Sequence, residues 1–246
     1  MNIGMIGLGR MGGNMTERLL NNGHHVVAYD TDFKAIGTVV ELGAFSARSL
    51  ADVVEHLDAP RTIWVMVPAG DITEHTVNEF IQLLDPGDTL IDGGNSNYKE
   101  SQRRAEYAES KGIHFLDAGV SGGVWGLVNG YCLTVGGDRD TYDRNRPIFE
   151  SLAPSESHGD LYVGPSGAGH YVKMIHNGIE YGMMQAYAEG FELLAAKKDL
   201  QLDIVAIAEN WRNGSVIRSW LLDLTAEELD REPDLQSLSS YVDDSG

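Results

Sequence analysis

Short runs rich in β-branched and aromatic residues alternate with amphipathic helical patterns over about the first 160 residues of the chain. The apolar runs have the length and composition of strands, whereas the segments between them repeat apolar residues at helical spacing. We predict strands at residues 2–6, 25–29, 62–67, 89–92, 113–117 and 131–136. We predict helices between them at residues 11–22, 32–42, 73–84, 97–111 and 139–152.

This alternation predicts an α/β fold, a Rossmann-type doubly wound sheet that is mostly parallel, with room for an antiparallel far edge. Strand signals stop at Pro165, and an all-helical domain is expected to follow. We place the boundary between residues 1–164, a dinucleotide-binding domain, and residues 165–246, a helical substrate and dimerisation domain. Helices are expected at residues 166–197, 202–211, 214–223 and 226–231, and none in the polar segment 234–246.

The net charge of the chain argues against two classes of binding partner, nucleic acids and anionic membranes. The chain has 37 acidic against 18 basic residues and a net charge of −19. Such a field repels nucleic acids and anionic membrane surfaces. The acidity has two readings, either an ordinary acidic bacterial protein or a halophilic one adapted to a salt-rich cytoplasm.

Three further observations concern the compartment. The single cysteine, Cys132, cannot form an internal disulfide, which fits a reducing environment. The first residues enter a strand pattern directly and show no secretory signal. The longest apolar run, at 63–67, is far too short to span a bilayer. We therefore expect a soluble, cytoplasmic protein.

A glycine fingerprint follows the first predicted strand and opens the first helix. Its residues are Gly7, Leu8, Gly9, Arg10, Met11 and Gly12. This G-x-G-x-x-G pattern lets the backbone approach a pyrophosphate at the N-terminus of the helix. Asp30 lies 18 residues after Gly12, near the spacing expected for a carboxylate that binds ribose hydroxyls. Because that carboxylate would repel a 2′-phosphate, we favour NAD over NADP. The alternative is that Asp30 caps the next helix.

Two more glycine loops fall where strands are predicted to end, at residues 92–96 and 119–123. In a doubly wound sheet, ligands bind at the carboxyl ends of the strands. Each loop combines exposed backbone N–H groups with a small polar side chain, and each is equally compatible with an ordinary turn.

Polar residues share one face of the helix predicted at 166–197. Their offsets of 3, 4, 7 and 8 from the first member are those of a helical stripe that normally faces a core. Burial of these groups without a ligand would be costly. The residues are Lys173, His176, Asn177, Glu180 and Tyr181.

Together the motifs GLGRMGGNM, VPAG (67–70), DGGNSNY, GVSGGVWG and GAGHYVKMIHNGIEYGMMQ resemble the decarboxylating 6-phosphogluconate dehydrogenases. The resemblance extends over nearly the whole chain and is most specific at HNGIEYG. It favours the family's short form, which is commonly NAD-linked, in agreement with Asp30. The wider 3-hydroxyacid dehydrogenase superfamily shares the glycine fingerprint, an SGG loop and a lysine, but is less similar around Glu180.

The resemblance implies oxidative decarboxylation of 6-phosphogluconate to ribulose 5-phosphate in the pentose phosphate pathway, for gluconate utilization. Lys173 would be the base that accepts the hydroxyl proton, and Glu180 the acid that protonates the product carbon. Cofactor contacts would include Val67, Pro68, Ala69 and Asn95. Substrate contacts would come from Asn95, Ser121, Gly122, Gly123, His176, Asn177 and Tyr181. A homo-oligomer, dimer or tetramer, is expected, and no metal.

One departure from the family pattern concerns the substrate's phosphate. A lysine-containing glycine-rich loop and a later arginine would be expected beyond Gly246, so the helical domain is expected to be incomplete at its C-terminus, or the phosphate to be held differently. Arg218 could substitute, or could be an ordinary surface arginine. Two alternatives stay open: a non-decarboxylating enzyme resembling 3-hydroxyisobutyrate dehydrogenase, and a fragment that binds NAD without turnover.

Overall fold

The computed structural model describes residues 1–155, 158–233 and 235–239. The chain forms two compact units, of which the first ends at Met174 and the second begins at Ile175. Of the segment 234–246, residues 235–239 are not helical, and the remainder lies outside the described residues. Within the described residues, no helix combines the length and the apolar character that a membrane crossing requires.

The first unit contains an eight-stranded mixed sheet with the order β3-β2-β1-β4-β5-β6-β7-β8. Neighbouring strands are parallel except β6 and β7, which pair antiparallel. This confirms the mostly parallel Rossmann-type sheet, and β3 and β8 extend it beyond the strands predicted from the sequence. The strands are β1 (Asn2–Ile6), β2 (His25–Tyr29), β3 (Phe45–Ser46), β4 (Thr62–Val65), β5 (Thr89–Asp92), β6 (His114–Ser121), β7 (Cys132–Gly137) and β8 (Asp160–Gly164).

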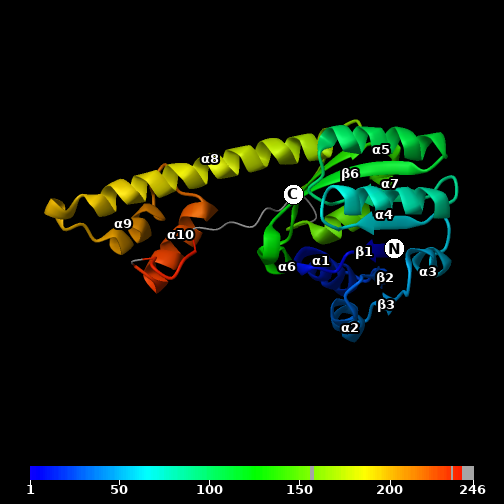
Figure 1. Cartoon of the computed structure of the whole chain (residues 1–246), viewed down its shortest axis with the longest axis horizontal. Helices are drawn as coiled ribbons and strands as arrows, with labels where there is room; N and C mark the ends of the chain where they lie inside the picture. The colour runs from blue at the N-terminus through cyan, green and yellow to red at the C-terminus, as the bar shows by residue number, and fades with distance from the viewer. Residues whose placement is uncertain (156–157, 234, 240–246) are drawn as a thin grey trace. The chain divides into compact units, whose positions relative to one another are not determined.

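Helices cover both faces of this sheet. One core joins α1 (Arg10–Asn21), α2 (Phe33–Glu41) and α7 (Arg139–Leu152) to one face. The other joins α3 (Leu50–Glu55), α4 (Asp71–Leu83) and α5 (Tyr98–Ser110) to the opposite face. Successive residues of a strand point to opposite faces, so Trp64 enters the first core while its neighbours Ile63 and Val65 enter the second. Figure 1 labels these elements.

Local capping explains where several of these helices begin. Ser49 accepts a hydrogen bond from the backbone of Asp52 at the start of α3, and Asn97 accepts one from Lys99 at the start of α5. Asp138 does the same for Thr141 at the start of α7. These short polar side chains satisfy N–H groups that have no partner inside the helix.

The segment after β6 carries a short 3₁₀ helix, η1 (Gly123–Trp125), and a short helix, α6 (Gly126–Asn129). β6 itself is longer than the strand predicted at 113–117, because its pairing with β7 continues to Ser121 opposite Cys132. β4 is shorter than the strand predicted at 62–67, and it ends at Val65. A bend at Val67 and a turn at residues 69–70 lead into α4.

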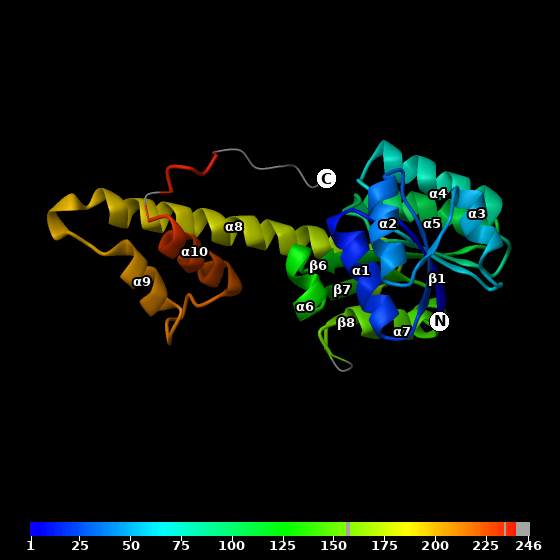
Figure 2. The same ribbon diagram turned by 90° about the horizontal axis from the view of Figure 1, so that it is seen from below.

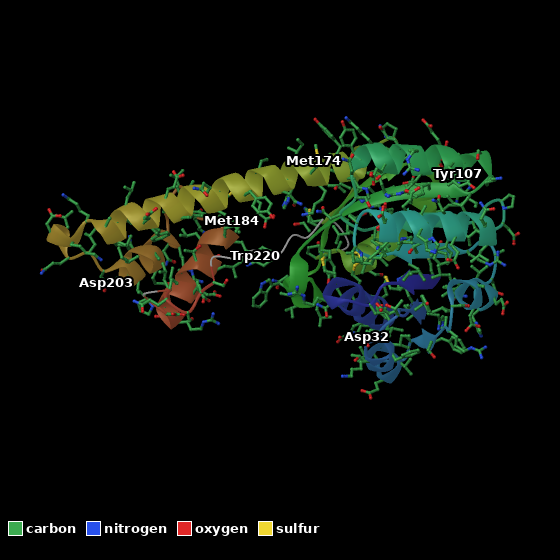
Figure 3. The ribbon with its side chains drawn as sticks, in the orientation of Figure 1. Asp32, Tyr107, Met174, Met184, Asp203 and Trp220 are labelled. Atoms are coloured by element: carbon green, nitrogen blue, oxygen red, sulfur yellow. The ribbon has the colours of Figure 1, made fainter. Side chains whose placement is uncertain are left out.

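The second unit begins inside α8 (Ala168–Ala196) and continues through η2 (Lys198–Leu200), α9 (Ile204–Trp211) and α10 (Trp220–Arg231). Its small core consists of Ala208, Ala226 and Leu229, with Phe191 packed against them. Asp203, labelled in Figure 3, caps α9 by accepting a hydrogen bond from the backbone of Ala206.

The prediction of separate helices at 214–223 and 226–231 is wrong, because one helix, α10, replaces them. Ser219 accepts a hydrogen bond from the backbone of Leu222 and so sets the start of this helix. Before it, Gly214 has a φ of 80°, which a right-handed helix does not allow. The Tyr187 hydroxyl donates to the carbonyl of Ile217 at 2.5 Å and thereby holds this turn against α8.

Candidate cofactor and active site

The glycine fingerprint forms a tight turn between β1 and α1. Gly7 has a φ of 88° and its amide donates to the carbonyl of Tyr29 at 2.9 Å. A Cβ on Gly12 would lie 1.9 Å from the Gly7 carbonyl oxygen, so only glycine lets the helix approach the turn this closely. By contrast, a Cβ on Gly9 would have no heavy atom within 4 Å. Protein atoms therefore pack tightly against the turn at Gly12, whereas the turn has open space beside Gly9.

The N-terminus of α1 suits an anionic group. Its N-cap is Gly9, which offers no side-chain cap, and its first turn contains no acidic residue. The N–H groups of this turn and the positive end of the helix dipole are then available to a pyrophosphate. The residues present thus fit the diphosphate of a dinucleotide.

Asp30 follows β2 and lies beside the glycine turn. Its Oδ2 accepts a hydrogen bond from the backbone N–H of Leu8 at 2.5 Å, and its Oδ1 accepts one from Asp32 at 2.8 Å. The cap of α2 is Asp32, whose carboxylate accepts from the backbone of Lys34. Asp30 is therefore not the helix cap, and its carboxylate is held against the cofactor turn with acceptor capacity left for ribose hydroxyls.

The parallel register aligns the ends of the central strands. Ile6 pairs with Tyr29 and with Val65, and Val65 pairs with Asp92. The glycine turn, Asp30 and the two segments that follow β4 and β5 therefore leave the sheet at the same edge, as in other doubly wound folds. These segments carry the candidate residues Val67, Pro68, Ala69 and Asn95.

Buried polar contacts shape the turn after β5. Asp92 is fully buried; its Oδ1 accepts from the backbone of Gly94 at 3.1 Å, and its Oδ2 lies 3.2 Å from Nη1 of Arg104. Arg104 is itself buried and also contacts Glu74 and Glu100. The Asp92 carboxylate is thus paired with Arg104 in the interior and fixes the turn that precedes Asn95. We therefore assign it a structural role and not a catalytic one.

The second glycine loop follows β6. Ser121 is the last residue of that strand, and Gly122 and Gly123 have φ values of 134° and 51°. Such values favour glycine and turn the chain directly into η1. Asp117 of β6 pairs with Asp92, the last residue of β5, and β6 continues four residues further to Ser121. β6 therefore extends beyond the end of its parallel neighbour β5.

The start of α8 packs on the backbone of β6 and β7. Asp117, fully buried, accepts hydrogen bonds from the backbone N–H groups of Gly167 at 2.6 Å and His170 at 2.8 Å. A Cβ on Gly169 would lie 2.2 Å from the carbonyl oxygen of Asp117. The Thr134 hydroxyl adds a hydrogen bond to the Gly169 carbonyl at 3.1 Å. A carboxylate and a bare glycine backbone together hold the helix on the sheet.

This packing sets the position of Lys173. A Cβ on Gly119 of β6 would lie 2.5 Å from the Cβ of Lys173, so the lysine leaves α8 directly beside the strand that ends at Ser121. Lys173 is partly buried. Figure 3 labels the next residue, Met174, on the first turns of α8.

The remaining candidates lie in the part of α8 that belongs to the second unit. His176 Nδ1 is 3.2 Å from Asn177 Oδ1 and 3.7 Å from Glu180 Oε2. Asn177 and Glu180 are partly buried, whereas Tyr181 is exposed. Within this segment the structure thus brings the imidazole, the amide and the carboxylate together.

Sequence reasoning missed Asp117, although it fell inside a predicted strand. The available signal was a charged residue in a strand of a doubly wound sheet, where both faces are normally buried. The described residues contain no group of three or more His, Cys, Asp or Glu side chains arranged to hold a metal ion.

We expect Asp117→Asn to lower the free energy of unfolding of the first unit. An amide can accept from only one of the two backbone N–H groups, those of Gly167 and His170, and presents its own N–H₂ to the other, which costs about 1–3 kcal/mol in a buried site. The measurement is urea unfolding followed by circular dichroism. Asp203→Asn is the control, because asparagine caps an exposed helix as well as aspartate does. Equal midpoints for both variants would contradict the role given to Asp117.

Two protein-family models match this chain, and both describe domains of the same enzyme family. The family model described as the NAD binding domain of 6-phosphogluconate dehydrogenase matches residues 2–164. The model of the 6-phosphogluconate dehydrogenase C-terminal domain matches residues 169–201.

Relatives in two organisms match along nearly the whole chain. An NAD(+)-dependent, decarboxylating 6-phosphogluconate dehydrogenase of Haloferax volcanii is 46% identical over 98% of this chain and 80% of its own length. A putative 6-phosphogluconate dehydrogenase of Bacillus subtilis is 42% identical over 100% of this chain and 82% of its own.

Solved structures show the same fold. The 6-phosphogluconate dehydrogenase of Plasmodium falciparum superimposes with a TM-score of 0.86 at 29% identity, covering 96% of this chain and 52% of that one. A 3-hydroxyisobutyrate dehydrogenase of Mycobacterium tuberculosis gives a TM-score of 0.76 at 28% identity, covering 89% of this chain and 72% of that one.

Proposed function

This chain belongs to the 6-phosphogluconate dehydrogenase family, and on that premise we propose how its residues carry out the reaction. The activity is the NAD-dependent oxidative decarboxylation of 6-phosphogluconate, a phosphorylated sugar acid, in the pentose phosphate pathway. The observation that supports our assignment of roles is the packing of α8 on β6, which sets Lys173 beside the strand ending at Ser121.

The cofactor end of the site comes from β1, α1 and β2. Residues 7–12 would receive the pyrophosphate at the N-terminus of α1, and Asp30 the ribose hydroxyls, with Val67, Pro68, Ala69 and Asn95 along the neighbouring strand ends. Bound NAD supplies the acceptor for the hydride that leaves C3 of the substrate. The open face at Gly9 and the Asp30 contact with Leu8 support this arrangement.

Lys173 is proposed as the general base. Its neutral amine would take the proton of the C3 hydroxyl as hydride departs, giving a 3-keto acid and a lysine ammonium. In a β-keto acid, the electrons of the bond to the carboxylate can move onto the ketone oxygen, so CO2 leaves. The ammonium of Lys173 would stabilise the developing enolate oxygen and return the proton to it.

Glu180 is proposed as the acid that completes the reaction. It would protonate the carbon that lost CO2 while the hydroxyl proton of the enediol returns to Lys173, which converts the enediol to ribulose 5-phosphate. Glu180 lies seven residues after Lys173 in α8, and residues at that spacing in an α-helix share a face about 10 Å apart. The partly buried state of both side chains supports a shared role.

The substrate contacts are proposals of the same kind. Ser121 and the N–H groups of Gly122 and Gly123 would bind the sugar acid from the β6 side, together with Asn95. His176, Asn177 and Tyr181 would bind it from α8. The contacts of His176 with Asn177 and Glu180 support a joint polar site on this helix.

We also propose the domain assignment, the oligomeric state and the compartment. Residues 1–164 would bind the dinucleotide, and the helical part from residue 165 would serve substrate binding and dimerisation. A homo-oligomer, dimer or tetramer, is supported by exposed apolar residues of α8, which include Val172, Ile175 and Ile179. A cytoplasmic location fits an enzyme of central sugar metabolism.

The test is turnover by the purified protein. With NAD and 6-phosphogluconate we expect NADH, CO2 and ribulose 5-phosphate in equal amounts, measured by absorbance, CO2 release and chromatography. The matched assay replaces the substrate with 3-hydroxyisobutyrate. NADH formed from 3-hydroxyisobutyrate, with none from 6-phosphogluconate, would instead support the non-decarboxylating alternative suggested by the likeness to the Mycobacterium tuberculosis enzyme.

A further inference from the structure

Two polar side chains of the cofactor helix α1 bind the segment that follows the Ser121–Gly123 loop. Arg18 Nη1 donates to the carbonyl of Leu127 at 3.0 Å, and Asn14 Nδ2 donates to the carbonyl of Val124 at 3.2 Å. The other guanidinium nitrogen, Nη2, donates to the carbonyl of Ala153 at 2.7 Å, where α7 ends. Helices α1 and α6 lie side by side in both views (Figures 1 and 2).

The segment that these bonds hold has little apolar burial of its own. Val124 and Trp125 each expose about half of their surface, and Val128 exposes 80%. On the inner side, Gly126 lies against the ring of the fully buried Tyr131, which leaves no room for a side chain there. Hydrogen bonds to backbone carbonyls are therefore a large part of what fixes this segment, and α1 provides two of them, from Asn14 to Val124 and from Arg18 to Leu127.

Arginine suits this position better than lysine. Its planar guanidinium directs two N–H groups at two carbonyls from different elements, which a single ammonium cannot reproduce in the same geometry. The carbonyl of Ala153 lies at the C-terminus of α7, where a positive charge is favoured by the helix dipole. Arg18 thus joins α1, α6 and the end of α7 at one point.

We propose that Asn14 and Arg18 are positioning residues. Their hydrogen bonds to Val124 and Leu127, which we call the clamp, hold the candidate substrate loop Ser121–Gly123 close to α1, the helix that would bind the cofactor. The N-terminus of α1 would receive NAD, and the clamp on the same helix holds the segment directly after Ser121–Gly123. Ordering of α1 by the dinucleotide therefore orders the loop that receives the sugar acid, and the two ligands assist one another's binding by the same factor. The inference rests on the proposed function of both sites.

Steady-state kinetics of Arg18→Met test the clamp. Methionine keeps the aliphatic length and removes both donors. We expect the KM for 6-phosphogluconate to rise about tenfold, the effect of losing about one hydrogen bond to a charged group, while kcat and the Kd for NAD change by less than about twofold. Arg18→Lys should give an intermediate KM, and Asn14→Ala a smaller rise. An unchanged KM in Arg18→Met, or a kcat that falls as much as KM rises, overturns the proposal.

Glu17→Gln is the matched control. It removes one charge from the same helix at the neighbouring position, and within the described residues no hydrogen bond or ion pair involves the Glu17 side chain. Its KM for 6-phosphogluconate should equal that of the unmodified protein. A KM that falls in Glu17→Gln by as much as it rises in Arg18→Met would mean that the charge of α1, and not the clamp, sets the affinity for this anionic substrate.

Amide hydrogen exchange tests the clamp without turnover. In the unmodified protein, NAD should slow exchange at residues 122–130; in Arg18→Met it should slow exchange in α1 but not in this segment. Arg18→Lys provides the same readout if the methionine variant folds poorly. If 6-phosphogluconate is not turned over at all, the proposed function is wrong. The hydrogen-exchange data still test whether Arg18 couples residues 122–130 to NAD binding at α1. Equal NAD-dependent protection of residues 122–130 in all variants overturns it.

Discussion

Lys173→Met is expected to abolish the oxidation of 6-phosphogluconate while leaving NAD binding nearly unchanged. Methionine has a similar length but no group that can accept the hydroxyl proton, and loss of a general base costs about 10²–10⁴-fold in rate. NAD binding should survive because Lys173 leaves α8 beside Gly119 of β6, whereas the candidate cofactor contacts lie at the start of α1 and in the segments that follow β1, β2, β4 and β5. The measurements are kcat from NADH formation and the Kd for NAD from calorimetry.

The control is Lys197→Met, which makes the same change just after the end of α8. The Lys197 side chain forms an exposed ion pair with Asp199, and such pairs contribute little. This variant should turn over normally. A Lys173→Met protein that produces NADH at the normal rate would rule out the lysine as the base.

Glu180→Gln separates the two halves of the reaction. It should impair formation of ribulose 5-phosphate but spare part of the oxidation, because the glutamate acts after hydride has left. Rapid mixing would then show NADH appearing ahead of the pentose phosphate. Loss of both products to the same extent as in Lys173→Met would contradict the role of Glu180 as the late acid.

Cofactor choice is the second large effect, and the unmodified enzyme is expected to prefer NAD over NADP by a hundredfold or more. The Asp30 carboxylate is fixed by N–H groups of Leu8 and Asp32, so it cannot easily turn away from a 2′-phosphate. Like charges held together at an interface cost several kcal/mol, which corresponds to discrimination of this size. The measurement is the ratio of kcat/KM for the two cofactors.

Asp30→Asn combined with Thr31→Arg should move this ratio toward NADP. The first change removes the repulsion, and the second adds a guanidinium that can pair with the phosphate. Asp32→Asn is the control, because it removes a charge two residues away while asparagine still caps α2. An unmodified enzyme that prefers NADP, or an Asp32→Asn shift as large as that of Asp30→Asn, would show that Asp30 does not read the ribose.

Local patterns in the sequence determined most of the first unit. Strands β1, β2 and β5 have the predicted bounds, since alternation of side chains and β-branched composition act over a few neighbouring residues. The glycine fingerprint was equally readable, because the turn from β1 to α1 is a local constraint. β3 was not readable: it is two residues long and exists only through its pairing with Val27 and Ala28.

Only the tertiary structure decided what supports the candidate site. Asp117 meets Gly167 and His170 across 50 and 53 residues, and Arg18 meets Leu127 and Ala153 across 109 and 135. Periodicity reports which face of an element is buried, but not which distant backbone group a buried carboxylate or guanidinium will meet. Those partners depend on how helices pack on the sheet, so the sequence by itself named Lys173 while the structure supplied the contacts that hold its helix.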